Sequence, residues 1–335
     1  MNRQVVTIFG GSGFIGRHLV RRLAKRGAEV RIAVRGIEAA HYLKPLGDVG
    51  QIVPWQTDIC KPAEVATAVS GADAVINLVG ILYERGGRTF QRLHVDAAAG
   101  IAAAARDAGV GRVLHMSALG ADSASPSAYG RSKADGEAAV KEAFPGATIF
   151  RPSVVFGPED NFFNMFAGMM RFLPMLPVIG APMLPKISIG GGKTGIDFFG
   201  DGGCRFQPVY VGDVAEAMMR ALDKTKSVGQ TFELGGPRVY SFKQIMELLL
   251  AVTERKRMLF PMPLALAEFE ALFLQLLPKP LLTPDQVKMM AVDNVLSGTA
   301  PGLAELDIAA SAAEAVLPSY LRRFRTPSHQ GAHAL

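Results

Sequence analysis

The chain has 335 residues, a formal net charge of +6 and a pI of about 9.4, with 49% hydrophobic and 20% charged residues. This composition is typical of a globular protein and argues against a disordered one. Two cysteines argue against a disulfide framework and favour a reducing compartment. No run approaches the roughly 18 apolar residues that a membrane-spanning helix needs, and the amino terminus predicts no targeting signal.

Lysine and arginine are scattered, with small clusters at residues 21–26 and 321–325. These clusters indicate either solvated helix faces or contact with an anionic cofactor, an acidic partner or anionic lipid. No basic stripe is interleaved with aromatic residues, which argues against nucleic acid as a partner. The six histidines show no metal-ligand spacing, so we expect no metal.

Strand and helix patterns alternate over the first 150 residues. Strands are expected at 4–9, 30–34, 51–55, 74–79, 112–117 and 147–151, and helices near 14–26, 62–70, 89–108 and 126–143. Alternation of this kind predicts βαβ units with right-handed crossovers and a parallel sheet. The fold class is therefore expected to be α/β, with a doubly wound parallel sheet.

The pattern changes after residue 157. Residues 172–185 carry four prolines and cannot form a regular helix, whereas 187–203 are rich in glycine and predict a loop or hairpin. A strand in 206–211, a helix in 213–224 capped by Asp213 and a strand at 230–234 follow, and the last hundred residues are mainly helical. The expected domains are a nucleotide-binding domain (1–157 with 205–235), a smaller, mainly helical cap (158–204 with 236–325) and a tail (326–335).

The first strand ends in a glycine-rich turn, and a helix pattern follows it, in the sequence VVTIFGGSGFIGRHL. Its glycines fit two spacings, G-x-G-x-x-G from Gly11 or G-x-x-G-x-x-G from Gly10. Glycines let the backbone approach a pyrophosphate, and the helix N-terminus offers it free N–H groups. The alternative is a turn that binds nothing. The turn predicts a Rossmann-type dinucleotide site with contacts from Gly10, Ser12, Gly13, Phe14, Ile15, Gly16 and Arg17.

The end of the second strand selects the form of the cofactor. A protein that prefers NAD usually places an acid there to bind the ribose hydroxyls, but the strand ends RIAVRG, with Arg35 at that position. Arg17 and Arg35 together suit a 2′-phosphate, so NADPH is favoured over NADH. The alternative is that Arg35 only ends the strand in solvent.

Later strand ends supply further expected contacts to the cofactor. Asp58, after the third strand, is placed to accept a hydrogen bond from the adenine amine, and Gly80 ends the fourth strand beside the expected groove. The remaining expected contacts at these strand ends are Ile59, Leu78 and Val79.

A serine, a tyrosine and a lysine form a second pattern. Ser117 ends the fifth strand, and Tyr129 and Lys133 form Y-x-x-x-K at the start of the next helix. Residues four apart share one helix face, so the phenol and the ammonium can reach one pocket. We expect the ammonium to lower the pKa of the phenol, so that Tyr129 exchanges a proton with a carbonyl or alcohol oxygen that Ser117 also binds. Lys133 would also hold the nicotinamide ribose.

This combination resembles the extended short-chain dehydrogenase/reductase superfamily, in which Ser, Tyr and Lys do this work. The resemblance implies that residues 150–160, FRPSVVFGPED, form its sixth strand. In that superfamily the backbone from Pro152 to Val155 would meet the nicotinamide.

A narrower resemblance covers most of the chain. The stretches NLVGILYERGGRTFQRLHVDAA, RPSVVFGPEDNFFN, RFQPVYVGDVAEA and ELGGPRVYSF are similar to the 39-kDa accessory subunit family of respiratory complex I. The resemblance implies an NADPH-binding, structural or regulatory subunit on the peripheral arm, near the membrane and the quinone site. It places the chain in the cytoplasm, peripheral on the cytoplasmic side of the inner membrane.

The chain departs from the family pattern in two ways, and the first of them leaves an enzymatic function open. The Ser-Tyr-Lys set is intact, which leaves open an NAD(P)H-dependent reductase or a nucleotide-sugar epimerase. Residues 181–203 resemble an insertion without an assigned role. Residues 172–185 and 263–278 are candidates for contact with a membrane surface or a partner, and the alternative for 263–278 is a buried helix over the substrate cleft.

Overall fold

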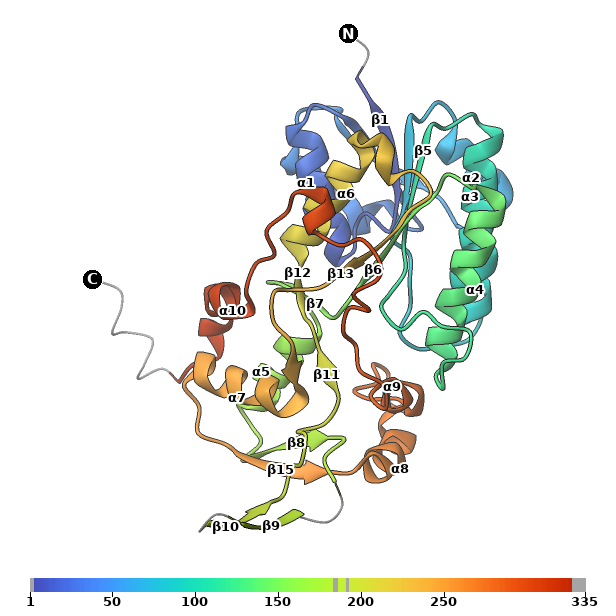
Figure 1. Cartoon of the computed structure of the whole chain (residues 1–335). Coiled ribbons are helices and arrows are strands. Elements are labelled where there is room, and N and C mark those ends of the chain that lie inside the picture. Colours follow the sequence, from blue (N-terminus) through green and yellow to red (C-terminus); the bar gives the residue numbers. More distant parts are fainter. Residues whose placement is uncertain (1–2, 183–185, 191–192, 327–335) are drawn as a thin grey trace, which may run out of the picture. The chain divides into compact units, whose positions relative to one another are not determined.

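The chain divides into two compact units in the computed structural model, which describes residues 3–182, 186–190 and 193–326 (Figure 1). Unit 1 consists of Met1–Pro152, Val211–Leu234 and Leu296–Ala310. Unit 2 consists of Ser153–Tyr210, Gly235–Val295 and Ser311–Leu335. Residues 296–310, which the sequence groups with the cap, belong to unit 1.

Unit 1 is built on a seven-stranded parallel sheet with the order β13-β6-β5-β4-β1-β2-β3. Its strands are β1 (Val5–Phe9), β2 (Glu29–Val34), β3 (Ile52–Gln56), β4 (Ala74–Asn77), β5 (Arg112–Met116), β6 (Thr148–Pro152) and β13 (Thr231–Leu234). The order reverses between β1 and β4, where ligands of such sheets bind at the carboxyl ends of the strands. The predicted α/β class and doubly wound sheet are confirmed.

Helices cover both faces of this sheet (Figure 1). One layer holds α1 (Phe14–Lys25) and α6 (Val211–Asp223), and the other holds α2 (Pro62–Val69), α3 (Ala97–Asp107) and α4 (Ala128–Ala143). Apart from the edge strand β3, the strands are mostly buried because both of their faces pack against helices. The unit also contains the short helices η1 (Ile37–Leu46), η2 (Gln91–Asp96), η3 (Thr225–Ser227) and η4 (Ala304–Leu306).

Three local features of unit 1 differ from the sequence-based expectation. The helix expected near 89–108 begins as a π-helical turn, η2, and continues as α3. A 3₁₀ helix, η1, follows β2 where no helix was expected. Helix α6 begins at Val211, so Asp213 lies in its first turn and is not its cap.

Unit 2 has its own apolar core, centred on helices α5 and α7 and rich in phenylalanine. Its helices are α5 (Phe162–Met169), α7 (Phe242–Thr253), α8 (Leu264–Leu274), α9 (Pro284–Met289), α10 (Ala313–Leu321) and η5 (Arg322–Phe324). Its strands are β7 (Val155–Phe156), β8 (Met175–Ile179), β9 (Lys186–Gly190), β10 (Lys193–Asp197), β11 (Arg205–Phe206), β12 (Val209–Tyr210), β14 (Tyr240–Ser241) and β15 (Met258–Met262).

Within the segment with four prolines, residues 175–179 form strand β8, which pairs in parallel with β15, and 183–185 lie outside the described residues. The glycine-rich segment after it contains an antiparallel hairpin of β9 and β10, as one of the two sequence-based alternatives predicted. Within the described residues, no helix is both long and apolar enough to cross a bilayer.

Candidate functional site

The glycine-rich turn connects β1 to α1 and leaves the start of the helix open. Gly10 has a φ of +80° and accepts a hydrogen bond from the backbone N–H of Gly13 (3.0 Å). Gly13 is the N-cap residue of α1; no described side chain caps the helix there, and its first turn carries no acidic residue. The first N–H groups of α1 and its positive dipole end are therefore available to an anion such as a pyrophosphate.

Gly16 allows the closest approach within this turn. A Cβ atom at this position would lie 2.5 Å from the carbonyl oxygen of Gly11 and 2.6 Å from that of Gly10. Both contacts are with backbone atoms, which cannot move aside as a side chain can. A glycine is therefore required for the helix to start this close to the turn.

Tyr42 joins the turn to η1, and the sequence analysis missed it because η1 itself was not expected. Its hydroxyl donates to the carbonyl oxygen of Ser12 (2.7 Å), and the Arg17 guanidinium lies 5.1 Å from the centre of its ring. A cation over an aromatic face is attracted by the ring, so Tyr42 holds Arg17 in place. Arg35 follows β2 and is exposed, without an ion pair to any described residue.

Asp58 has a structural role in the connection from β3 to α2. Its carboxylate accepts from the backbone N–H of Cys60 (3.0 Å), and its own N–H donates to Glu64 (2.7 Å). Ile59, beside it, packs partly against the core of unit 1. The contact expected between Asp58 and the adenine amine stays a prediction.

The end of β4 is held in place by a buried amide. Asn77 accepts from the N–H of Val79 (3.0 Å), and its Nδ2 lies 3.2 Å from Nδ1 of His115 on β5. The N–H of Leu78 donates to Phe9 of β1 (2.9 Å). A Cβ atom at Gly80 would lie 3.4 Å from Nζ of Lys133, so the structure brings this strand end and the lysine together.

The structure also brings Ser117, Tyr129 and Lys133 together. Lys133 Nζ donates to the carbonyl oxygen of Met116 (3.2 Å) and lies 5.9 Å from the centre of the Tyr129 ring. Ser127 caps α4 by accepting from the N–H of Gly130 (2.9 Å), which sets where the helix carrying both residues begins. Ser117 Oγ is buried and has no hydrogen-bond partner among the described residues, so it can bind a ligand oxygen.

The expected lowering of the phenol pKa is wrong for this chain. Burial raises the pKa of Tyr129 to about 12. Burial also lowers the pKa of Lys133 to about 8, although the charge of Glu137 partly opposes this. For both groups the main cause is burial, which removes water from around the charged form.

His94 is a buried neighbour of Tyr129 that the sequence analysis also missed. Its Nε2 accepts from the N–H of Ile81 (3.0 Å), and its Nδ1 lies 2.9 Å from Oγ of Ser132, which donates to the carbonyl oxygen of Tyr129 (2.8 Å). Burial, and secondarily the charge of Lys133, lowers the pKa of His94 to about 3. The ring is therefore neutral, with its proton on Nδ1 pointing at Ser132.

The π-helical turn places His94 against α4. A Cβ atom at Gly136 of α4 would lie 2.2 Å from the carbonyl oxygen of His94, so only glycine permits this approach. Single π-helical turns often mark functional sites. This feature of helix geometry is the signal that the sequence alone did not reveal.

The remaining expected cofactor contacts fall in different units. Pro152 ends β6 in unit 1 and accepts from the N–H of Leu119 (2.9 Å). Val155 belongs to β7 in unit 2, where it pairs with Val209 of β12.

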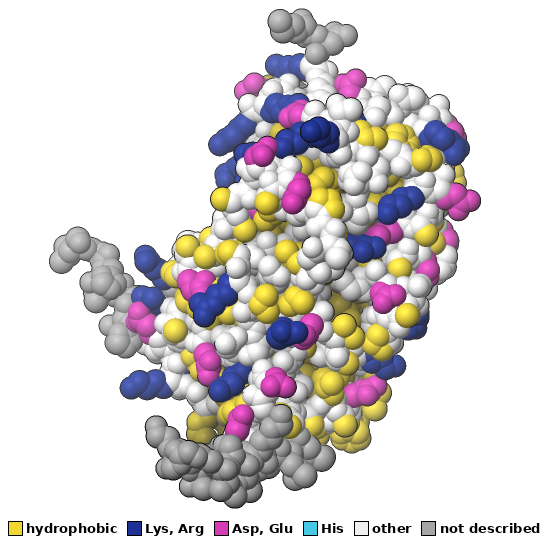
Figure 2. Space-filling view, viewed as in Figure 1, with side chains coloured by type: hydrophobic (Ala, Val, Ile, Leu, Met, Phe, Trp, Pro, Cys, Tyr) yellow, Lys and Arg dark blue, Asp and Glu magenta, His cyan; other side chains and the backbone are white. Residues whose placement is uncertain are grey.

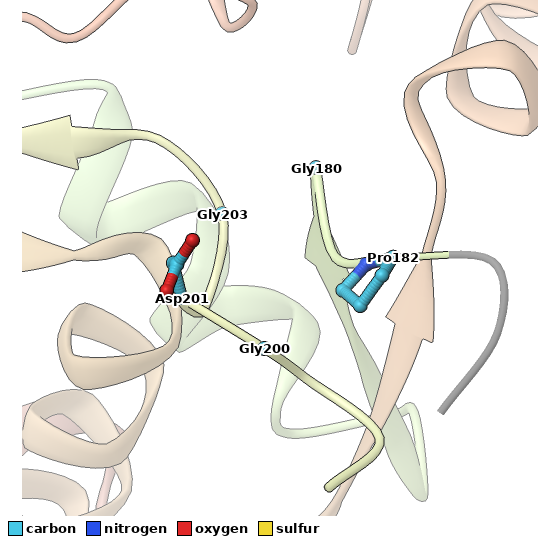
Figure 3. A pocket seen from close by; sticks show the side chains of 5 residues that line it. All are labelled: Gly180, Pro182, Gly200, Asp201 and Gly203. Atoms are coloured by element: carbon cyan, nitrogen blue, oxygen red, sulfur yellow. The ribbon is translucent and has the colours of Figure 1, made fainter. Parts of the chain in front are cut away.

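A small cavity of about 240 Å³ lies in unit 2 and is lined by Gly180, Pro182, Gly200, Asp201 and Gly203 (Figure 3). Among these described lining residues only Asp201 is ionisable, and acid–base chemistry or metal binding needs a second such group. The described residues also contain no group of three His, Cys, Asp or Glu side chains placed to hold a metal.

The groups at the carboxyl ends of the unit 1 strands fit a nicotinamide dinucleotide. The open start of α1 and the close approach at Gly16 fit its pyrophosphate, and the partnerless hydroxyl of Ser117 fits a polar atom at the other end. Such a cofactor supplies hydride transfer when bound. The protein's own groups would bind and orient it, and Tyr129, whose pKa burial raises, would keep its proton.

Residues 6–235 match the family model described as the NAD dependent epimerase/dehydratase family. This range includes all of the glycine-rich turn and the Ser-Tyr-Lys set. The family therefore implies a nicotinamide cofactor.

Two relatives match nearly the whole chain. Both are named NADH dehydrogenase (ubiquinone) 1 alpha subcomplex subunit 9, mitochondrial. The Arabidopsis thaliana protein is 35% identical over 319 residues, which cover 91% of this chain and 74% of the relative. The Mus musculus protein is 33% identical over 324 residues, which cover 96% of this chain and 81% of the relative.

Among solved structures, a nucleoside-diphosphate-sugar epimerase from Staphylococcus aureus is similar in fold. It superposes with a TM-score of 0.69 over 95% of this chain and 99% of that chain, at 14% identity. At this identity the likeness concerns the fold alone. With the family match and the two relatives, it follows that this chain belongs to the NAD dependent epimerase/dehydratase family and, within it, to the family of the 39-kDa subunit 9 proteins of NADH dehydrogenase.

Proposed function

We propose that this chain is an NADPH-binding accessory subunit of NADH:quinone oxidoreductase (complex I), structural or regulatory near the quinone site. The observation that carries the proposal is the similarity to subunit 9 proteins along 91% and 96% of the chain, because it includes both units and not only the nucleotide fold. An epimerase-like fold alone would not distinguish this role from many others.

The preference for NADPH rests on two guanidiniums in unit 1. Arg17 is held over the ring of Tyr42, and Arg35 is exposed without an ion pair among the described residues. Guanidiniums bind phosphate oxygens in pairs and keep their charge at any physiological pH. An exposed arginine after β2, in place of an acid, favours the cofactor with the extra phosphate.

For partners, we propose subunits of the peripheral arm, with contact to a membrane surface on the cytoplasmic side of the inner membrane. Residues 172–185 and 263–278 are the proposed contacts, and 183–185 lie outside the described residues. Hydrophobic side chains gather over α8 at the lower right of Figure 2. The large exposed ones are Leu266, Phe269, Leu272 and Phe273. A helix with this much exposed apolar surface fits an interface better than free solvent.

Native electrophoresis of membrane extracts tests the role as a subunit. A tagged chain should migrate with NADH:quinone oxidoreductase activity. Nucleotide released from the purified complex should be NADPH, in an amount that does not fall when NADH and quinone are turned over. Recovery of the chain only as a free protein would rule out the subunit role.

Arginine variants test the cofactor preference separately. Arg17→Gln and Arg35→Gln should each lower NADPH affinity about tenfold and leave NADH affinity nearly unchanged, because each removes one charged contact to the phosphate. Arg21→Gln on α1 is the matched control and should change neither. Equal losses for both coenzymes would contradict the assignment of these arginines to the 2′-phosphate.

A second candidate is an active NAD(P)H-dependent reductase or nucleotide-sugar epimerase. The observation that favours it is the buried hydroxyl of Ser117, which has no partner among the described residues and follows Met116, whose carbonyl oxygen Lys133 contacts; such a hydroxyl suits a substrate oxygen. Oxidation of NADPH by the purified chain with a panel of carbonyl compounds and nucleotide sugars tests it. Activity that Tyr129→Phe abolishes while NADPH still binds would establish an enzyme, and no activity with any of them would favour the accessory role.

A further inference from the structure

Unit 2 carries a cluster of basic side chains contributed by three separate segments. One lies just after α5, one connects α7 to β15, and one forms η5 near the end of the described chain. We call this cluster the cationic patch; it consists of Arg171, Arg255, Lys256, Arg257, Arg322 and Arg323.

Hydrogen bonds to backbone carbonyls hold these segments together. Arg257 Nε donates to the carbonyl oxygen of Met170 (3.0 Å), and Arg255 Nε donates to that of Phe324 (2.6 Å). Partial burial and the nearby charges of Arg257 and Arg171 lower the pKa of Arg255. The three guanidiniums are therefore close enough to repel one another.

No carboxylate among the described residues forms an ion pair with any member of the cationic patch. Glu254, next to the patch, pairs instead with Arg325 (2.8 Å). Arg323 donates to the amide oxygen of Asn164 (2.7 Å), which carries no charge. Within this unit the repulsion has no compensating partner, so an external anion would stabilise it.

Large apolar side chains project beside these cations. Phe172 is 81% exposed and Met258 is 67% exposed. The guanidinium of Arg171 lies 5.7 Å from the centre of the Phe172 ring, and the N–H of Met258 donates to Pro174 (3.2 Å). Met258 also begins β15, which leads to α8 and its exposed leucine and phenylalanine side chains. The exposed side chains of Phe172 and Met258 thus lie beside cations of the patch.

We propose that the cationic patch, with Phe172 and Met258, docks on a bilayer that carries anionic headgroups. Guanidiniums bind the phosphate oxygens of lipid headgroups, and the two apolar side chains insert below them. An acidic protein surface would satisfy the charges but would leave no apolar layer for Phe172 and Met258. The proposal rests on the proposed placement at a membrane and names the lipid chemistry of that contact.

Flotation of the purified full-length chain with vesicles tests the proposal. Binding should be strong to phosphatidylcholine vesicles that contain phosphatidylglycerol, weak to phosphatidylcholine alone, and reduced by salt because exposed charges are screened. The triple variant Arg171→Gln, Lys256→Gln, Arg322→Gln should bind anionic vesicles about 100-fold more weakly. These three side chains are exposed, so the variant should keep its fold.

Matched variants separate the patch from net charge. The control Arg21→Gln, Lys25→Gln, Lys226→Gln removes three exposed positive charges from unit 1 and should bind nearly as the unchanged chain does. Phe172→Ser should weaken binding to anionic vesicles without changing its salt dependence. Equal loss in both triple variants would overturn the proposal, as would equal binding to the two kinds of vesicle.

Co-migration with complex I distinguishes this inference from the proposed function. A chain that binds anionic vesicles through the patch but never migrates with complex I would support the patch as a lipid contact and refute the subunit role. A chain that migrates with complex I but binds no vesicle would refute the patch as a lipid contact. In that case an acidic protein surface would be its occupant.

Discussion

Residues 21–26 of unit 1 and residues 321–325 of unit 2 are both rich in arginine, yet their surroundings differ. In unit 1, Arg22 lies 3.6 Å from Glu216 and Arg26 pairs with Asp223, so α6 supplies carboxylates to α1. In unit 2, Arg325 pairs with Glu254 (2.8 Å), but Arg322 and Arg323 have no ion pair among the described residues. Arg22 and Arg26 thus have carboxylates of their own unit beside them, whereas Arg322 and Arg323 have none among the described residues.

The comparison teaches that the elements packed against a basic segment, and not the segment itself, decide whether its charges are neutralised.

The two units also carry two kinds of site. The nucleotide site of unit 1 depends on backbone contacts and on buried groups with named partners, so small changes should have large effects. The cationic patch depends on charge and exposure, so single changes should affect only what it binds.

The largest effect is expected from Gly16→Val in the glycine-rich turn. Because the new side chain would clash with the backbone of Gly10 and Gly11, the free energy of unfolding should fall by about 3 kcal/mol and NADPH binding should be lost. Urea unfolding measures the free energy of unfolding, and fluorescence titration measures NADPH binding. Gly100→Ala on the exposed face of α3, where a Cβ meets nothing within 4 Å, is the control and should not destabilise. A stable, NADPH-binding Gly16→Val variant would refute the close-approach argument.

A buried histidine of unit 1 predicts a pH effect. Burial lowers the pKa of His115 to about 3, below its ordinary value of 6.5. The folded chain therefore keeps it neutral while the unfolded chain protonates it. This contribution to stability is fully present above pH 6.5 and is lost as the pH falls towards 3.

At pH 4.5 the free energy of unfolding should be about 2–3 kcal/mol lower than at pH 7.5 because of His115. His115→Asn, which keeps an acceptor for Asn77, should show a smaller difference between urea unfolding at the two pH values. His41→Asn, at an exposed position, should behave as the unchanged chain. An unchanged pH dependence in His115→Asn would mean that the ring is not the buried neutral group that we describe.

A smaller effect is expected from Tyr42, which holds Arg17. Tyr42→Phe loses only the hydrogen bond to Ser12 and should raise the Kd for NADPH about threefold. Tyr42→Leu loses the ring as well and should raise it about tenfold. The Kd for NADH should change less than twofold in both. A parallel loss for NADH would show that Tyr42 shapes the turn and not the phosphate contact.

The smallest effect is expected from Arg322→Gln in the cationic patch. Since Arg322 has no ion pair among the described residues, the free energy of unfolding should change by less than about 0.5 kcal/mol. Thermal and urea unfolding measure it. A clear destabilisation would show that unit 2 uses this charge internally and would remove the contrast between the two arginine-rich segments.

The regular parts of unit 1 were predictable from local pattern. The six strands expected in the first 150 residues and the helices between them are present, because a strand buried on both faces is continuously apolar and its helices are amphipathic. The helices η1 and η2 were not predictable in the same way. Their residues Tyr42 and His94 contact Ser12 and Ser132, which lie 30 and 38 residues away in the chain, so local spacing does not reveal these contacts.

The sequence by itself determined the order of elements, the glycine-rich turn and the position of the Ser-Tyr-Lys set, because each depends on residue type and local spacing. Only the tertiary structure decided the pKa of Tyr129, the neutral state of His94 and the contrast between the two basic segments. These depend on burial and on charges distant in the chain, and the free energy of a charged group is set by what surrounds it in space.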